Sequence, residues 1–197
     1  LQDNPELCGL NVTVPYKEQV MSYLNELDAN AKRIGAVNVI SIKEGKLKGY
    51  NTDSDAFLET IDKWLPKAKT FRALVLGTGG SSKAVQQALK NREIPFELVS
   101  REESKGQHTY EGLKSAKVLA NFNLVINTTP LGMHPNTANY PPIPYDQLTA
   151  NHFVYDLIYN PARTVFLQKA EMKGSSIKNG LEMLQIQAEK AWAIWNS

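Results

Sequence analysis

The chemistry-bearing residues that stand out first lie between Arg72 and Lys83, in the sequence RALVLGTGGSSK. An apolar run is followed by Gly77, Gly79 and Gly80, and then by a predicted helix. A glycine turn exposes backbone N–H groups, and a helix N-terminus adds partial positive charge, so this order of elements binds anions. It suits a dinucleotide pyrophosphate, although Ser82 replaces the third glycine of G-x-G-x-x-G. The alternative is a strand–helix turn without a ligand.

These glycines belong to a predicted strand–helix–strand unit over 72–76, 83–90 and 96–100, which is the unit that a dinucleotide site requires. The second strand should end at the residues that contact the adenosine ribose. An acidic residue there would favour NAD. The strand ends instead at Ser100-Arg101, with Lys105 close behind, which favours the 2′-phosphate of NADP. Glu102 and Glu103 weaken this positive field.

Lys17 is a second candidate for chemistry. A strand is predicted over 10–14 and stops at Pro15, and apolar residues at helical spacing predict a helix over 16–27. Lys17 would then lie in the first turn of that helix, where the dipole disfavours an ammonium and helps it to give up a proton. The alternative is a solvated surface lysine.

Two further polar positions lie within apolar elements. A hairpin is predicted from the strands 35–41 and 47–51, and Asn38 within it either faces solvent or forms hydrogen bonds in a cleft. Asp53 precedes a helix predicted from Ala56 to Leu65, for which capping alone would explain an aspartate.

The rest of the chain continues the alternation of strands and helices. Strands are predicted over 123–127, 153–158 and 175–178, and a helix ends before Gly174. The loop 128–133 follows a strand at its carboxyl end, where such folds bind ligands. A closing helix has an apolar stripe that we expect to be core, with Gln187 beside it in a position to face a cleft; the stripe comprises Leu181, Leu184, Ala188, Ala191, Trp192 and Trp195.

Composition excludes several classes of protein. The net charge of +2 is too small to indicate nucleic acid or an anionic membrane as a partner, and no apolar run has the length of a membrane span. The single cysteine and three scattered histidines give no metal-ligand spacing. These features predict a reducing, cytoplasmic location. Because the chain opens on Leu1 and on what reads as the end of a helix, we expect an N-terminal portion to be absent.

Seven segments occur in an order that resembles the shikimate dehydrogenase family: NVTVPYK, GAVN, GYNTD, GTGG, NTTPLGM, DLIYNP and NGLEMLQIQA. They run through nearly the whole chain. The resemblance implies an α/β protein with a Rossmann-like, doubly wound NADP domain over 67–178. It also implies a discontinuous α/β substrate domain, built from 1–66 and a returning C-terminal helix over 179–197, with a cleft between the two domains.

The resemblance implies NADPH-dependent reduction of 3-dehydroshikimate to shikimate, a step of aromatic amino-acid biosynthesis. By motif, the catalytic pair is Lys17 and Asp53. The substrate-binding positions, all hydrogen-bonding side chains, are Thr13, Asn38, Asp53, Tyr159 and Gln187. The cofactor-binding positions are Gly77, Gly79, Gly80, Ser81, Ser82, Ser100, Arg101, Lys105, Thr128, Leu157 and Gly180.

The chain departs from the family pattern in a few places. The opening segment with its carboxylate-binding serine pair has no counterpart, Ser54 and Ala56 replace glycines, and Glu102 replaces a threonine. Two alternatives therefore accompany the main hypothesis: a quinate/shikimate dehydrogenase of broader cofactor use, and a nucleotide-binding paralogue without catalysis. The expected partner is a small-molecule substrate, with no nucleic acid and no membrane, and a homodimer stays open.

Overall fold

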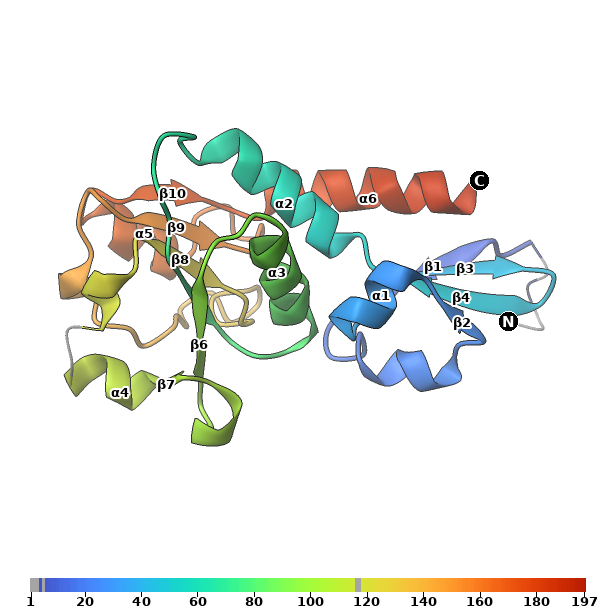
Figure 1. Ribbon diagram of the computed structural model, residues 1–197, viewed down its shortest axis with the longest axis horizontal. Coiled ribbons are helices and arrows are strands. Elements are labelled where there is room, and N and C mark those ends of the chain that lie inside the picture. Colours follow the sequence, from blue (N-terminus) through green and yellow to red (C-terminus); the bar gives the residue numbers. More distant parts are fainter. Residues whose placement is uncertain (1–3, 5, 116–117) are drawn as a thin grey trace.

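The computed structural model describes residues 4, 6–115 and 118–197. Two β-sheets lie side by side along the longest axis of the molecule (Figure 1). The chain begins in a four-stranded sheet, continues into a six-stranded sheet, and ends in helix α6 (Leu181–Trp195), which runs along the long axis (Figure 1). Among the described residues, no helix has the length and apolar character needed to span a bilayer.

The four-stranded sheet has the order β1-β3-β4-β2. Its strands are β1 (Gly9–Asn11), β2 (Glu26–Leu27), β3 (Val39–Lys43) and β4 (Lys46–Tyr50). β3 and β4 form the predicted antiparallel hairpin, and its turn places Glu44 and Gly45 at φ angles of 50° and 75°. The predicted strand over 10–14 is shorter than expected, because regular pairing with β3 stops at Asn11.

The helix predicted over 16–27 is wrong. This segment forms a short 3₁₀ helix, η1 (Gln19–Tyr23), and then strand β2, which pairs with β4. The backbone N–H of Asn25 donates to the carbonyl of Leu47 (3.0 Å), and the amide oxygen of Asn25 accepts from Leu47 N–H (2.8 Å). Sheet pairing therefore overrides local helical periodicity, while Val20, Met21, Leu24 and Leu27 still pack on the core of this sheet, as an apolar face should.

The six-stranded sheet is parallel throughout, with the order β10-β9-β8-β5-β6-β7. Its strands are β5 (Ala73–Leu76), β6 (Phe96–Ser100), β7 (His108–Thr109), β8 (Leu124–Asn127), β9 (Phe153–Asp156) and β10 (Ser176–Lys178). This is the doubly wound arrangement, in which strand order reverses between β5 and β8 and ligands bind at the carboxyl ends. The predicted α/β class and the predicted strand–helix–strand unit are confirmed.

Helices cover both faces of the parallel sheet. They are α2 (Asp53–Trp64), α3 (Gly80–Asn91), α4 (Tyr110–Ser115) and α5 (Val165–Glu171), with α6 at the end and the 3₁₀ turns η2 (Glu103–Lys105), η3 (Leu119–Asn121) and η4 (Tyr145–Gln147) in the connections. Helix α1 (Ala29–Ile34) belongs to the other half, where Ala31 packs in the core of the four-stranded sheet. α2, α3 and α6 share one buried core with the sheet, and α4 and α5 share another on the opposite face. Phe57 of α2 packs edge-to-face on Tyr155 of β9, with ring centroids 5.1 Å apart.

The apolar stripe predicted for α6 is only partly core. Ala191 is fully buried, but Leu181 is 45% exposed and Trp192 is 66% exposed, whereas Met183 and Ile186 are buried. Apolar side chains occur around much of the circumference of α6, so their spacing alone predicted the wrong face of the helix as core. Trp195 donates its indole N–H to the carbonyl of Ile40 on β3 (3.0 Å), which ties α6 to the four-stranded sheet.

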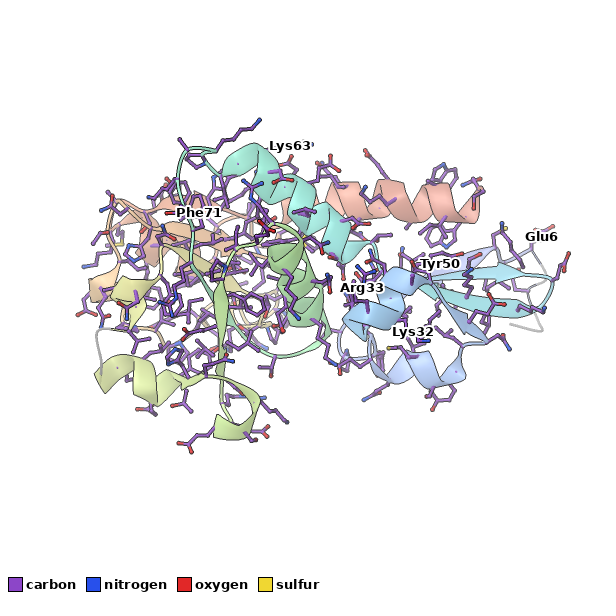
Figure 2. The ribbon with its side chains drawn as sticks, viewed as in Figure 1. Glu6, Lys32, Arg33, Tyr50, Lys63 and Phe71 are labelled. Atoms are coloured by element: carbon purple, nitrogen blue, oxygen red, sulfur yellow. The ribbon has the colours of Figure 1, made fainter. Side chains whose placement is uncertain are left out.

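A seam between α1 and α3 joins the two sheets. Ile34 and Ala36 pack with Ala84 in a small buried cluster, and the Lys83 ammonium lies 2.5 Å from the carboxylate of Glu18. The side chains of Lys32 and Arg33 project from the last turn of α1, where positive charge complements the helix dipole (Figure 2). Helices α2 and α6 pack in the core of the parallel sheet, and each also contacts the half that contains the four-stranded sheet. The domain boundaries at 66/67 and 178/179 therefore stay predictions.

Candidate active site

Lys17 and Asp53 form an ion pair in the space between the two sheets. Lys17 lies in a turn two residues before η1, and Asp53 is the first residue of α2. The Lys17 ammonium lies 2.6 Å from Asp53 Oδ2, and the two side chains are only 12% and 7% exposed. The predicted pair is thus brought together by the fold. Because Lys17 is not in a helix, the helix-dipole argument for its proton does not apply, and Asp53 is the feature that distinguishes it from a solvated lysine.

Capping does not explain Asp53. The side chain of Asn51 caps the first turn of α2 instead, since its Oδ1 accepts from the backbone N–H of Ser54 (3.2 Å). Asn51 is itself held by the bond from its Nδ2 to the carbonyl of Ala36 (2.9 Å). The carboxylate of Asp53 is directed instead to Lys17 and Asn38.

Asn38 is the hub of the polar cluster. It is 3% exposed, which settles the choice between solvent and a hydrogen-bonded cleft. Its Nδ2 lies 3.0 Å from Asp53 Oδ1, 2.9 Å from Thr52 Oγ1 and 3.2 Å from Gln187 Oε1, and its Oδ1 accepts from Thr52 N–H (2.8 Å). An amide with both ends bound has a fixed orientation, so Asn38 fixes the carboxylate that faces Lys17.

Thr52 and Gln187 extend this cluster to α6. The Thr52 hydroxyl donates to the backbone carbonyl of Gln187 (3.1 Å), and the Gln187 side chain donates to the carbonyl of Leu184 (3.0 Å). Gln187 thus faces the cluster, although it is far from it in sequence. Thr52 was missed as a site residue, because within Asn51–Asp55 it reads as one more helix cap; the polar GYNTD segment was the available signal.

The glycine turn after β5 has the geometry of an anion site. Gly77 has φ +107°, and a Cβ there would lie 2.8 Å from Thr128 Oγ1, so only glycine fits. Ser82 is fully buried and donates its hydroxyl to the carbonyl of Gly77 (2.7 Å), which confirms that serine is small enough for the close approach of helix and strand. Gly79 is the N-cap residue of α3, which has no side-chain cap, and the space around its Cβ position is open.

The glycine turn and the Lys17–Asp53 pair are neighbours. A Cβ on Gly80 would lie 3.0 Å from the Cβ of Lys17 and 3.6 Å from that of Ala36. The N-terminus of α3 therefore abuts the turn that bears Lys17. An anion bound at α3 would lie close to the Lys17–Asp53 pair.

The other predicted cofactor residues follow the carboxyl ends of successive strands. They are Ser100 and Arg101 at the end of β6, Thr128 after β8, Leu157 after β9 and Gly180 after β10. The strands are parallel, so these positions share one edge of the sheet with Gly77. Thr128 is held there by donating from Oγ1 to the carbonyl of Leu76 (2.7 Å).

The predicted 2′-phosphate clamp is partly neutralised by its own loop. Ser100 is buried and accepts from Glu102 N–H (3.1 Å), which fixes the turn, and Arg101 is exposed. The Lys105 ammonium pairs with the carboxylate of Glu102 (2.9 Å), so Glu102 does weaken the local positive field. Among the described residues, neither a hydrogen bond nor an ion pair occupies the guanidinium of Arg101.

Two predicted substrate residues lie apart from the cluster. Thr13 is exposed, one residue beyond Val12, whose N–H donates to the carbonyl of Asn38 (2.8 Å). Tyr159 lies on the loop after β9 and is 48% exposed. Across the part of the chain that the structure describes, no hydrogen bond joins either side chain to Asn38, Asp53 or Gln187.

A buried carboxylate at the same edge of the sheet was not predicted. Asp156 ends β9 and is fully buried. It accepts from Asn127 Nδ2 (3.0 Å) and Ile158 N–H (3.1 Å) through Oδ1, and from the Thr164 hydroxyl (2.6 Å) through Oδ2. Burial outweighs these donors and raises the pKa of Asp156 to about 6. In the sequence, Asp156 opens the segment DLIYNP, but its neighbours in the chain did not indicate that this residue itself has a role in the site.

Because of Asp156, the free energy of unfolding should decrease as pH rises from about 4 to about 6. An unfolded aspartate ionises near 3.8, whereas the folded carboxyl has a pKa of about 6, so between these values the unfolded chain loses a proton that the folded chain keeps. Burial also raises the pKa values of the neighbouring Tyr145 and Tyr155, so both hydroxyls stay neutral here. Wild type should lose about 2 kcal/mol relative to Asp156→Asn between pH 4 and pH 6.5.

Chemical unfolding at several pH values measures this difference. The matched control is Asp146→Asn, the same change at an exposed position in η4, which should keep the pH dependence of the wild type. Parallel pH profiles for wild type and Asp156→Asn would contradict the assignment of the titration to Asp156.

No group of three or more histidine, cysteine, aspartate or glutamate side chains is arranged to hold a metal ion within residues 4, 6–115 and 118–197. The polar cluster is therefore built from a lysine, a carboxylate and amides. Such groups move protons and read hydroxyls.

Comparison with known proteins gives the cluster its context. The family described as shikimate dehydrogenase substrate binding domain matches residues 1–40. The shikimate dehydrogenase (NADP(+)) of Methanococcus aeolicus is 40% identical over 199 residues, which cover 95% of this chain and 72% of that protein.

Solved structures agree in fold. Shikimate dehydrogenase 1 from Peptoclostridium difficile is 38% identical, with a TM-score of 0.85 over 96% of this chain and 71% of that one. Shikimate 5-dehydrogenase from Thermus thermophilus, in complex with NADP(H) and shikimate, is 31% identical, with a TM-score of 0.84 over 98% of this chain and 75% of that one. With this identity over this share of both chains, the protein belongs to the shikimate dehydrogenase family.

Proposed function

We propose that this chain is an NADP-dependent oxidoreductase that reduces 3-dehydroshikimate to shikimate, with Lys17 as the proton donor. Family membership supports the reaction class, since the relatives named above are shikimate dehydrogenases. The observation that carries the proposal is the Lys17–Asp53 pair beside the glycine turn, at 2.6 Å and nearly buried. A binding module would need the glycine turn but not an adjacent proton donor.

The residues at the sheet edge fit a dinucleotide. The uncapped N-terminus of α3 and the open space at Gly79 suit a pyrophosphate, and Gly77 lets the backbone approach it. Arg101 is exposed at the end of β6, where it would hold the 2′-phosphate together with Ser100 and the partly neutralised Lys105. Gly80, Ser81, Ser82, Thr128, Leu157 and Gly180 complete the proposed cofactor contacts.

The proposed reaction needs a hydride and a proton. When bound, the reduced nicotinamide supplies the hydride to the ketone carbon. Lys17 then gives its ammonium proton to the oxygen that becomes the hydroxyl, and it takes the proton back in the reverse reaction. Asp53 holds the ammonium in place at 2.6 Å, and Asn38 keeps the Asp53 carboxylate oriented. The pair is nearly buried, so little water competes for this proton.

Neutral hydrogen-bonding side chains would read the ring hydroxyls of the substrate. Asn38 contacts both Asp53 Oδ1 and the side chain of Gln187, so these groups already lie together beside Lys17. We assign Thr13 and Tyr159 to the same task, since both side chains are exposed and could turn toward a bound ligand. A site built on such groups discriminates strongly against analogues that lack a hydroxyl.

Location and assembly belong to the same proposal. A cytoplasmic location suits an enzyme that draws on NADPH, and a homodimer is compatible with the exposed outer face of α6. Light scattering after size-exclusion chromatography would measure the assembly.

Loss of NADPH absorbance after addition of 3-dehydroshikimate tests the function. We expect turnover with NADPH and at least about tenfold lower kcat/KM with NADH, because a charged 2′-phosphate contact is absent from NADH. Faster oxidation of quinate than of shikimate, with NAD used as readily as NADP, would favour the broader quinate/shikimate dehydrogenase. NADPH binding without turnover of any of these substrates would favour the non-catalytic paralogue.

A further inference from the structure

We propose that Asp156 is a positioning residue that fixes two ligand-facing loops relative to each other. The first loop, 128–133, follows β8 and contains the proposed cofactor contact Thr128. The second loop, 157–164, follows β9 and contains Leu157 and Tyr159. The inference rests on the proposed function, because the loops matter only if they contact the cofactor and substrate named above.

The carboxylate reaches the first loop through Asn127. Asn127 and Asp156 are register partners at the ends of β8 and β9, and Asn127 Nδ2 donates to Asp156 Oδ1 (3.0 Å). This bond turns the other end of the amide toward the loop, where Asn127 Oδ1 accepts from Thr129 N–H (3.0 Å) and from the Thr129 hydroxyl (2.6 Å). Asn127 is fully buried, so its orientation is set by these partners alone.

The same carboxylate holds both ends of the second loop directly. At the start, Asp156 Oδ1 accepts from Ile158 N–H (3.1 Å), which fixes the backbone on either side of Leu157. At the end, the Thr164 hydroxyl donates to Oδ2 (2.6 Å) and also accepts from Leu167 N–H (3.3 Å) as the cap of α5. The chain directly after the first loop also touches the second, since His134 N–H donates to the carbonyl of Asn160 (3.2 Å).

Every oxygen of Asp156 faces donors, so an amide of the same shape cannot replace it. If the nitrogen of an asparagine took the place of Oδ1, it would face two other donors, Asn127 Nδ2 and Ile158 N–H. If it took the place of Oδ2, it could donate to Thr164 Oγ1, but the hydroxyl proton of Thr164 would then lose its acceptor. Asp156→Asn therefore disturbs the hydrogen bonds of at least one loop without changing the volume of a fully buried side chain.

Hydrogen exchange of the ligand-free protein tests the effect on the loops. In Asp156→Asn, the amides of Thr129 and Ile158, or that of Leu167 if the asparagine nitrogen faces Thr164, should exchange about tenfold faster than in wild type. The control Asp146→Asn, at its exposed position, should exchange at wild-type rates. Unchanged exchange at all three amides in Asp156→Asn would overturn the inference whether or not the protein is an enzyme.

Kinetics test whether the loops are used. Asp156→Asn should lower kcat/KM for 3-dehydroshikimate roughly 10- to 100-fold, as expected for misplaced contacts, and should raise KM for NADPH. Thr164→Ser keeps the hydroxyl and should stay near wild type, while Thr164→Val should approach Asp156→Asn. Faster loop exchange with unchanged kinetics would also overturn the inference. An inactive wild type would instead reject the proposed function, and the exchange experiment would then decide the role of Asp156 in ordering the loops.

Discussion

Replacing Lys17 by methionine should lower kcat about 10²- to 10⁴-fold, the usual contribution of a positioned general acid. Methionine keeps the length and apolar body of the side chain but cannot give a proton to the new hydroxyl. Cofactor binding should change little, because the part of Lys17 nearest to the Cβ position of Gly80 is its aliphatic chain, which methionine largely keeps. Single-turnover kinetics and NADPH titration, read by fluorescence, separate the two quantities.

A loss of rate could also come from the carboxylate that Lys17→Met leaves unpaired, since Asp53 is only 7% exposed. The double variant Lys17→Met/Asp53→Asn removes that charge and should recover stability without recovering rate. Lys48→Met, which removes an ammonium that is 42% exposed on β4, should leave kcat near wild type. Wild-type turnover in Lys17→Met would exclude Lys17 as the proton donor.

Gly180→Ala should destabilise the fold by about 3 kcal/mol or more, the upper end of what overpacking costs. An added Cβ would lie 2.0 Å from the carbonyl oxygen of Leu157 and 2.6 Å from its carbon, and both are backbone atoms that cannot rotate away. For a chain of this length, the Tm should fall by roughly 6–12 °C. Because relief of the clash moves Leu157, a proposed nicotinamide contact, KM for NADPH should rise as well.

Gly79→Ala is the matched control, and it should show the opposite pattern. Gly79 has φ −80°, which alanine adopts freely, and nothing lies within 4 Å of its Cβ position. Its Tm should stay within about 2 °C of wild type, while NADPH affinity falls because the methyl group occupies the proposed pyrophosphate site. Equal Tm values for Gly180→Ala and wild type would mean that the loop after β9 relaxes without cost.

The features predicted well from the sequence are those that depend on neighbours in the chain. The strand–glycine turn–helix at 72–91 is local, and β6 spans Phe96–Ser100 as predicted. The segment 16–27 failed because its conformation is decided by pairing with β4, about twenty residues away. Local periodicity carries no information about a partner strand.

The same limit explains what was missed in the site. Asn38 was recognised as unusual, but its partners Thr52 and Gln187 are set by tertiary packing, so burial could not be inferred. Asp156 lies within the predicted strand 153–158 and is the last residue of β9, and an acid at a strand end usually faces water. Its complete burial depends on Asn127 and Thr164 meeting it, which only the sheet register and the start of α5 reveal.

The long span between Asn38 and Gln187 also affects how the protein is made. The two residues are 149 positions apart, and ribosomes add about 5–20 residues per second, so roughly 7–30 s separate their synthesis. During this interval the nascent four-stranded sheet carries Asn38 and Thr52 without their α6 partner, and Ile40 without the indole of Trp195. The polar cluster can therefore be completed only after α6 has been synthesised.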